Sequence, residues 1–84
     1  MDVTPYFERN VLDNPDRQGI TKVMCEEVVA NPEYSGTQAD GRTIYWQRPG
    51  SRDLYLRVGV TADGTALHNA FFDSNYTRKQ RRDE

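Results

Sequence analysis

Two Asp-Gly pairs limit the fold of this chain more than any other feature of its sequence. Asp40-Gly41 and Asp63-Gly64 each separate segments in which apolar and polar residues alternate. Asp-Gly is a preferred pair for the two-residue turn of a β-hairpin, because that turn needs positive φ angles. A loop over residues 49–53 separates the two hairpins. The pattern therefore predicts four antiparallel strands in a meander, over about 33–39, 42–48, 54–61 and 65–73.

The first thirty residues follow a helical pattern instead. Thr4 followed by Pro5 is a typical helix start, with a hydroxyl cap and a proline at the first helical position. One helix is predicted over about 5–12 and a second over about 21–30. We therefore expect a single α+β domain over residues 1–77, with two N-terminal helices packed on one face of a four-stranded antiparallel meander.

Charge is unevenly distributed along the chain. Residues 78–84 form a basic C-terminal tail, and the last eleven residues are compatible with either a short helix or a frayed end. The whole chain of 84 residues nevertheless carries a net charge of −2, whereas a nucleic-acid-binding protein is usually basic. No membrane span or secretory signal is predicted, and the single cysteine, Cys25, cannot form a disulfide within the chain. These features predict a cytoplasmic protein.

Several kinds of chemistry lack the residues that they need. The sequence contains no glycine-rich phosphate loop ending in Gly-Lys and no dinucleotide-binding fingerprint. One histidine and one cysteine cannot complete an ordinary closed zinc site. No pair of carboxylates is expected on the open face of the sheet, which argues against glycosidase chemistry. We therefore expect no metal and no cofactor.

The second hairpin also predicts which side chains share a face of the sheet. If Asp63-Gly64 is the turn, Val58 lies opposite Asn69 and Leu56 opposite Phe71. Counting back through the preceding loop places a tryptophan and an isoleucine on the same face as Leu56. The predicted face under the helices then holds Ile44, Trp46, Leu54, Leu56, Val58, Val60, Leu67 and Phe71.

This register leaves Tyr45, Arg57 and His68 together on the opposite, open face. Tyr45 would lie opposite Arg57, with His68 on the diagonal, roughly 7–8 Å away between backbones. Gly59 would lie opposite His68 and leave space in front of the imidazole. An imidazole can transfer a proton near neutral pH, a guanidinium can stabilise charge on a phosphate, and aromatic rings can stack on unpaired bases. The cluster is therefore a candidate catalytic site for RNA cleavage without a metal.

Each of these residues also has a structural interpretation. A lone histidine in a strand is more often structural or solvated than catalytic. Arg57 beside Tyr45 can be a stacked cation–aromatic pair on a solvated face. The tail can be a solubilising terminus that covers neighbouring aromatic residues, and Cys25 is typical of a small buried residue. The sequence leaves these alternatives open.

Five short motifs follow one another along the predicted meander: Asp40-Gly41-Arg42, Tyr45-Trp46, Tyr55-Leu56-Arg57-Val58, Asp63-Gly64 and His68-Asn69-Ala70-Phe71-Phe72-Asp73. With the two helices before them, residues 6–76 resemble a group of short bacterial proteins related to the RelE-like toxins, including the BrnT branch. The resemblance implies an α+β ribonuclease that is paired with an antitoxin.

The first functional hypothesis is a metal-independent ribonuclease toxin in which a 2′-hydroxyl of RNA attacks the neighbouring phosphate. His68 would act as general base or acid, Arg57 as phosphate clamp and Tyr45 as an orienting or proton-moving phenol. RNA-binding contacts are expected from Arg42, Arg48, Tyr55, Phe72, Arg78, Lys79, Arg81 and Arg82. The second hypothesis is a non-catalytic binding module of the same fold, which binds a protein partner such as a phage or host defence factor.

Overall fold

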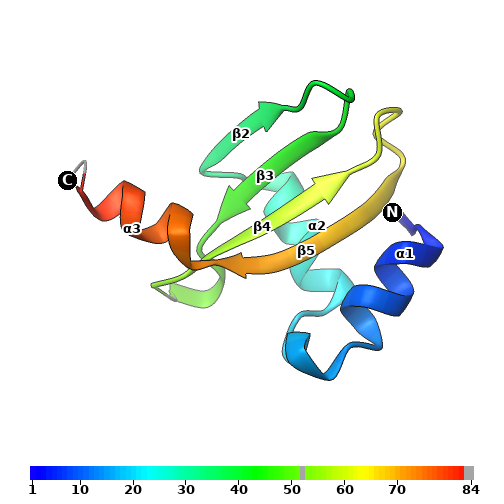
Figure 1. Cartoon of the computed structure of the whole chain (residues 1–84), viewed down its shortest axis with the longest axis horizontal. Coiled ribbons are helices and arrows are strands. Elements are labelled where there is room, and N and C mark those ends of the chain that lie inside the picture. Colours follow the sequence, from blue (N-terminus) through cyan, green and yellow to red (C-terminus); the bar gives the residue numbers. More distant parts are fainter. Residues whose placement is uncertain (52, 83–84) are drawn as a thin grey trace.

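The computed structural model describes residues 1–51 and 53–82. In this part of the chain, three α-helices and a five-stranded mixed sheet form an α+β fold (Figure 1). The strands are β1 (Asp2–Val3), β2 (Tyr34–Thr37), β3 (Thr43–Gln47), β4 (Tyr55–Val60) and β5 (Ala66–Asp73), in the spatial order β1-β5-β4-β3-β2. The helical segments are α1 (Pro5–Phe7), the π-helical turn η1 (Glu8–Leu12), the short 3-10 turns η2 (Pro15–Arg17) and η3 (Pro49–Ser51), α2 (Lys22–Ala30) and α3 (Ser74–Arg82).

The second predicted N-terminal helix is present as α2, whereas the first is α-helical only in α1 and continues as the π-helical turn η1. Both α1 and α2 begin at a threonine cap. Thr4 Oγ1 accepts a hydrogen bond from the Phe7 amide at 3.0 Å, and Pro5 occupies the first helical position. Thr21 Oγ1 accepts a hydrogen bond from the Met24 amide at 3.1 Å and begins α2. In Figure 1, α2 lies behind the strands, on one face of the sheet, and α1 lies beside β5. The other face is open over most of its length.

The core lies between the helices and the even-numbered residues of β4. Leu56, Val58 and Val60 are buried against residues of the helical layer and of β5, namely Phe7, Val11, Ile20, Cys25, Val28, Leu67 and Ala70. Burial raises the pKa of the Cys25 thiol to about 12, so the thiolate does not form near neutral pH. Cys25 is therefore a packing residue, as its sequence context suggested.

The sheet has one strand more than the sequence predicted. Strands β2 to β5 form the expected antiparallel meander, and positive φ angles of 91° at Gly41 and 76° at Gly64 turn its two hairpins. In addition, β1 pairs in parallel with the start of β5. A strand of two residues has no alternation that a sequence pattern could reveal. The predicted four-stranded antiparallel sheet is therefore corrected to a five-stranded mixed sheet.

The predicted cross-strand pairs of β4 and β5 are correct only next to the hairpin turn. Val60 lies opposite Leu67 as expected, but the following pair is Gly59 with Asn69. His68 is thus the extra residue of a β-bulge. Beyond the bulge every pair is shifted by one residue, which gives Val58–Ala70, Arg57–Phe71, Leu56–Phe72 and Tyr55–Asp73. The pairs predicted for Val58 and Leu56 are therefore wrong.

The register of β3 against β4 is also shifted by one residue. Trp46 lies opposite Arg57, and Tyr45 lies opposite Val58, because β4 begins one residue later than predicted, at Tyr55. A one-residue shift moves every side chain of a strand to the other face. Tyr45 therefore packs against the core, and Trp46 lies on the open face. Both predicted placements are wrong. One position of the predicted connecting loop, residue 52, lies outside the described residues.

A cluster of aromatic residues joins α3 to one end of the open face. Tyr76 of α3 stacks on Trp46 with ring centroids 4.5 Å apart, and its ring meets those of Tyr34 and Tyr55 edge-on. The hydroxyl of the buried Thr77 accepts a hydrogen bond from the Tyr55 amide at 3.0 Å. The C-terminal segment is thus a docked helix as far as the structure describes it. The last two residues of the predicted tail lie outside the described part.

Candidate functional site

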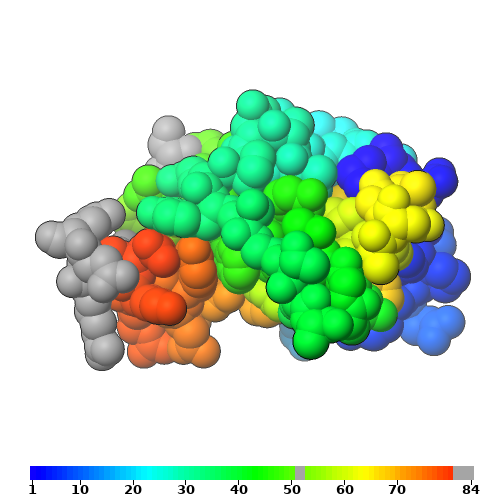
Figure 2. Space-filling view, turned by 90° about the horizontal axis from the view of Figure 1, so that it is seen from above, coloured from blue at the N-terminus to red at the C-terminus, as the bar shows by residue number. Residues whose placement is uncertain are grey.

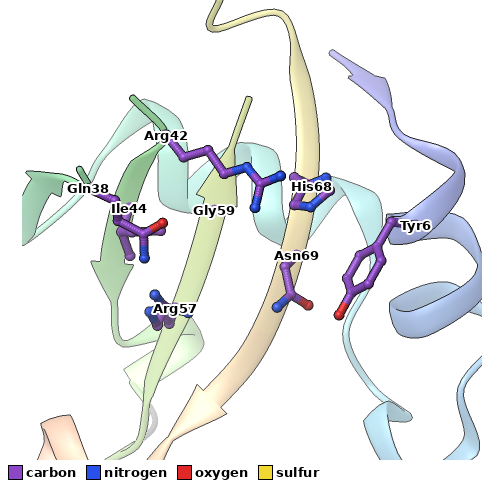
Figure 3. A pocket seen from close by; sticks show the side chains of 8 residues that line it. All are labelled: Tyr6, Gln38, Arg42, Ile44, Arg57, Gly59, His68 and Asn69. Carbon is purple, nitrogen blue, oxygen red and sulfur yellow. The ribbon is translucent and has the colours of Figure 1, made fainter. Parts of the chain in front are cut away.

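A cavity of about 530 Å³ opens on the face of the sheet that lies away from α2 (Figure 3). Its lining is mainly polar and basic, and consists of Tyr6, Gln38, Arg42, Ile44, Arg57, Gly59, His68 and Asn69. None of these lining residues is acidic. The cavity therefore presents hydrogen-bond donors and positive charge to any ligand that enters it.

The β-bulge accounts for two neighbouring residues of this lining. In a regular strand successive side chains point to opposite faces, but at the bulge two residues of β5 oppose Gly59 alone. His68 and Asn69 consequently both face the cavity. Gly59 has no side chain to fill the space between the strands. A Cβ at this position would lie 3.3 Å from Ile44 Cδ1, so the glycine keeps the floor of the cavity open.

Two residues from the N-terminal segment hold the imidazole of His68. The Tyr6 ring stacks on it with centroids 4.9 Å apart and planes at 18°. Thr4 Oγ1 lies 3.2 Å from His68 Nδ1. One lone pair of this hydroxyl accepts the Phe7 amide, and the other can accept Nδ1–H. In that tautomer Nε2 carries the free lone pair and is the ring nitrogen available to a ligand.

The surroundings of His68 favour its neutral form. Partial burial lowers the pKa of the imidazole, and the positive charge of Arg42 lowers it further, while Asp40 opposes this shift. The net direction is below the ordinary value of 6.5. At neutral pH the ring is therefore uncharged and able to accept a proton.

We expect an NMR titration of the His68 ring protons to give a pKa below 6.5. Because the folded state then binds fewer protons than the unfolded chain, the free energy of unfolding should decrease as the pH falls below about 6.5. Urea unfolding between about pH 5 and 7.5 measures this effect, and His68→Gln should remove its contribution. A titration midpoint at or above 6.5 would contradict the assigned environment.

Two arginines complete the basic side of the cavity. Arg57 lies on β4 with its guanidinium carbon 5.1 Å from the centre of the Phe71 ring. Arg42 directly precedes β3 in the chain. In Figure 3 its guanidinium extends over Gly59 towards His68. Its ion pair with Asp40 is long, at 3.7 Å, and exposed, so it is weak. Among the described residues no carboxylate lies within ion-pair distance of Arg57. Both charges are thus available to an anion.

Of the three residues predicted as catalytic, two line this cavity and one does not. His68 and Arg57 both line it. Tyr45 lies on the opposite side of the sheet, because of the one-residue shift in β3. The phenol beside the imidazole is instead that of Tyr6, which comes from α1.

The residues predicted to bind RNA are dispersed. Arg42 lines the cavity, but Arg48 forms an ion pair of 2.9 Å with Glu33 and lies over Tyr55, which is buried. Phe72 packs against the core and cannot stack on a base, which corrects its predicted open-face position. Both Tyr55 and Phe72 are thus unsuited to base stacking.

The tail cations lie on α3, which projects at the opposite end of the sheet from α1 (Figures 1 and 2). Arg78 and Lys79 are exposed there, and Arg78 donates a hydrogen bond to Asn75. The side chains of Arg81 and Arg82 lie outside the described residues.

Tyr6, Gln38 and Asn69 line the cavity but were not predicted as site residues, and Ile44, predicted on the face under the helices, lines the cavity instead. A signal for Asn69 exists. The buried residues Leu67 and Ala70 are three positions apart, which breaks the two-residue period of a strand and indicates a bulge at the polar pair between them. Tyr6 lies beside the buried Phe7 of a very short helix, where no periodic pattern fixes its direction.

Comparisons of the chain with protein-family models, with curated proteins and with solved structures found no match. Among residues 1–51 and 53–82, no helix is long and apolar enough to cross a membrane. In the same residues no group of three histidine, cysteine, aspartate or glutamate side chains is placed to hold a metal ion. The function is therefore best assigned from the chemistry of the cavity.

Proposed function

We propose that this protein is a metal-independent ribonuclease toxin of a bacterial toxin–antitoxin pair, and that it cleaves single-stranded RNA in the cavity around His68. The observation that carries the proposal is the lining of this cavity. It combines an imidazole whose pKa is lowered with the guanidinium groups of Arg42 and Arg57, and no lining residue is acidic. The resemblance of residues 6–76 to RelE-like toxins agrees with this assignment and implies the antitoxin partner.

The proposed reaction needs one proton acceptor and a positively charged phosphate site. The 2′-oxygen of RNA attacks the adjacent phosphorus while its proton moves to Nε2 of His68. The bond from phosphorus to the 5′-oxygen breaks, and this oxygen takes a proton from water. The hydroxide ion that remains takes the proton from His68, which restores the neutral imidazole. The products are a 2′,3′-cyclic phosphate and a 5′-hydroxyl. Arg42 and Arg57 stabilise the charge that develops on the non-bridging oxygens. Tyr6 keeps the imidazole in place by stacking on it.

Induced expression without an antitoxin should arrest bacterial growth, and Arg57→Ala should relieve the arrest. Loss of a charge-stabilising donor typically lowers the rate by about 10²–10³-fold, which is large enough to restore growth. Purified protein should cleave a single-stranded RNA oligonucleotide in the presence of a metal chelator, and the products should carry a cyclic phosphate.

Arg9→Ala is the matched control, because Arg9 is exposed on η1 and does not line the cavity. This variant should remain as toxic as the parent protein. If the parent protein neither arrests growth nor cleaves RNA, the catalytic function is refuted. The non-catalytic binding module is then the alternative to test.

A further inference from the structure

Asn69 is held in one orientation by two hydrogen-bond donors. Arg17 Nη1 donates to Asn69 Oδ1 at 2.7 Å, and the Ala70 amide donates to the same oxygen at 3.0 Å. A guanidinium and a backbone amide have no acceptor to offer in these positions. The side-chain oxygen of Asn69 must therefore face them. The opposite amide orientation would set the NH₂ group against two donors.

The NH₂ group of Asn69 consequently faces the cavity. In the view of Figure 3, its nitrogen lies on the side of Arg57 and its oxygen on the side of Tyr6. Asn69 thus adds uncharged donors to a lining that already holds Arg42 and Arg57. A cavity that offers donors from several directions suits a ligand that has only acceptors, such as a fully ionised phosphate group.

The side chain of Arg17 extends from η2 to Asn69 across the part of β5 that no other described strand covers. β1 pairs with β5 only at Ala66 and Leu67, so the following residues of β5 form an edge of the sheet. Arg17, at the end of η2, also donates to the Ala70 carbonyl at 3.3 Å. Its guanidinium carbon lies 5.7 Å from the centre of the Phe71 ring, which Arg57 also contacts. These contacts fix Arg17 beside the cavity.

We propose that Asn69 is a phosphate-binding residue of the cavity and that Arg17 is its positioning residue. The inference rests on the proposed function in one respect, namely that the bound phosphate belongs to RNA. Binding of the phosphate group itself does not require cleavage, so the two proposals can fail separately.

The test uses inorganic phosphate as the probe and follows the side-chain NH₂ signals of Asn69 by ¹H–¹⁵N NMR. Phosphate should shift these signals in the parent protein in a saturable way. Asn69→Asp keeps an oxygen for Arg17 but replaces the NH₂ group with a negatively charged acceptor. In this variant, phosphate binding is followed by the backbone amide signal of Gly59 and should weaken at least about tenfold. Unchanged binding in this variant, or Asn69 signals that do not respond to phosphate, would overturn the proposal.

Arg17→Gln tests the positioning role and should also weaken phosphate binding about tenfold. Arg17→Lys retains a donor for Asn69 and should restore most of the affinity, which a purely structural role would not predict. Arg9→Gln removes one exposed charge outside the cavity and should leave binding unchanged. Equal binding by Arg17→Gln and Arg9→Gln would refute the role of Arg17.

RNA cleavage separates this proposal from the proposed function. If the parent protein binds phosphate through Asn69 but cleaves no RNA, the catalytic function fails and the phosphate site stands. If Asn69→Asp cleaves RNA with the KM and kcat of the parent protein, the role of Asn69 fails and the catalytic function stands.

Discussion

Replacement of His68 by alanine is expected to lower the rate of RNA cleavage by about 10²–10⁴-fold, because the cavity then lacks its proton acceptor. Single-turnover measurements with an RNA oligonucleotide and a metal chelator provide the rate. The parent rate should rise with pH through the lowered pKa of His68 and then become level. His68→Ala should lose this dependence.

Added imidazole provides a direct check on that result. The alanine variant leaves a space beside the Tyr6 ring, into which free imidazole can stack. Cleavage by the variant should therefore increase with imidazole concentration, while the parent rate should not change. A variant as active as the parent protein would exclude His68 as the general base.

Replacement of Phe7 by alanine is expected to reduce the free energy of unfolding by about 3–5 kcal/mol. Phe7 is completely buried and joins α1 to the core residues of the sheet. Total stability is commonly about 5–15 kcal/mol and is low in small domains, so much of the variant should be unfolded at 37 °C. Urea unfolding followed by circular dichroism measures the loss.

The adjacent residue Tyr6 is the matched control for Phe7. Tyr6 is 45% exposed, and its ring covers His68 rather than the core. Tyr6→Ala should leave the free energy of unfolding within about 1 kcal/mol of the parent value. Equal destabilisation by the two variants would show that Phe7 does not contribute more than Tyr6 to the packing of α1 on the core.

Local chemistry explains which parts of the fold could be predicted from the sequence. The Asp-Gly pairs and the threonine caps act over two to four residues, so their effects are visible in the sequence. The α+β arrangement and the antiparallel meander follow from them.

The faces of β3 and β5 depend instead on single-residue shifts. β3 carries Ile44, Tyr45 and Trp46 in succession, so apolar residues point to both sides of the sheet and alternation cannot select between two registers. In β5 the bulge at His68 reverses the faces of all later residues. These two shifts exclude Tyr45 and Phe72 from the open face while leaving Arg57 and His68 on it.

The hydroxyl of Thr4 makes the chemistry of the cavity depend on the fraying of a helix end. This one group caps α1 through the Phe7 amide and also contacts His68 Nδ1. The ends of helices open locally far more often than a domain unfolds. Each opening of the first turn withdraws the hydroxyl that contacts His68 Nδ1, and it also moves the neighbouring Tyr6 off the imidazole. A ligand that tightens this turn and a ligand that loosens it would therefore change the basicity of the cavity in opposite directions, without touching the sheet.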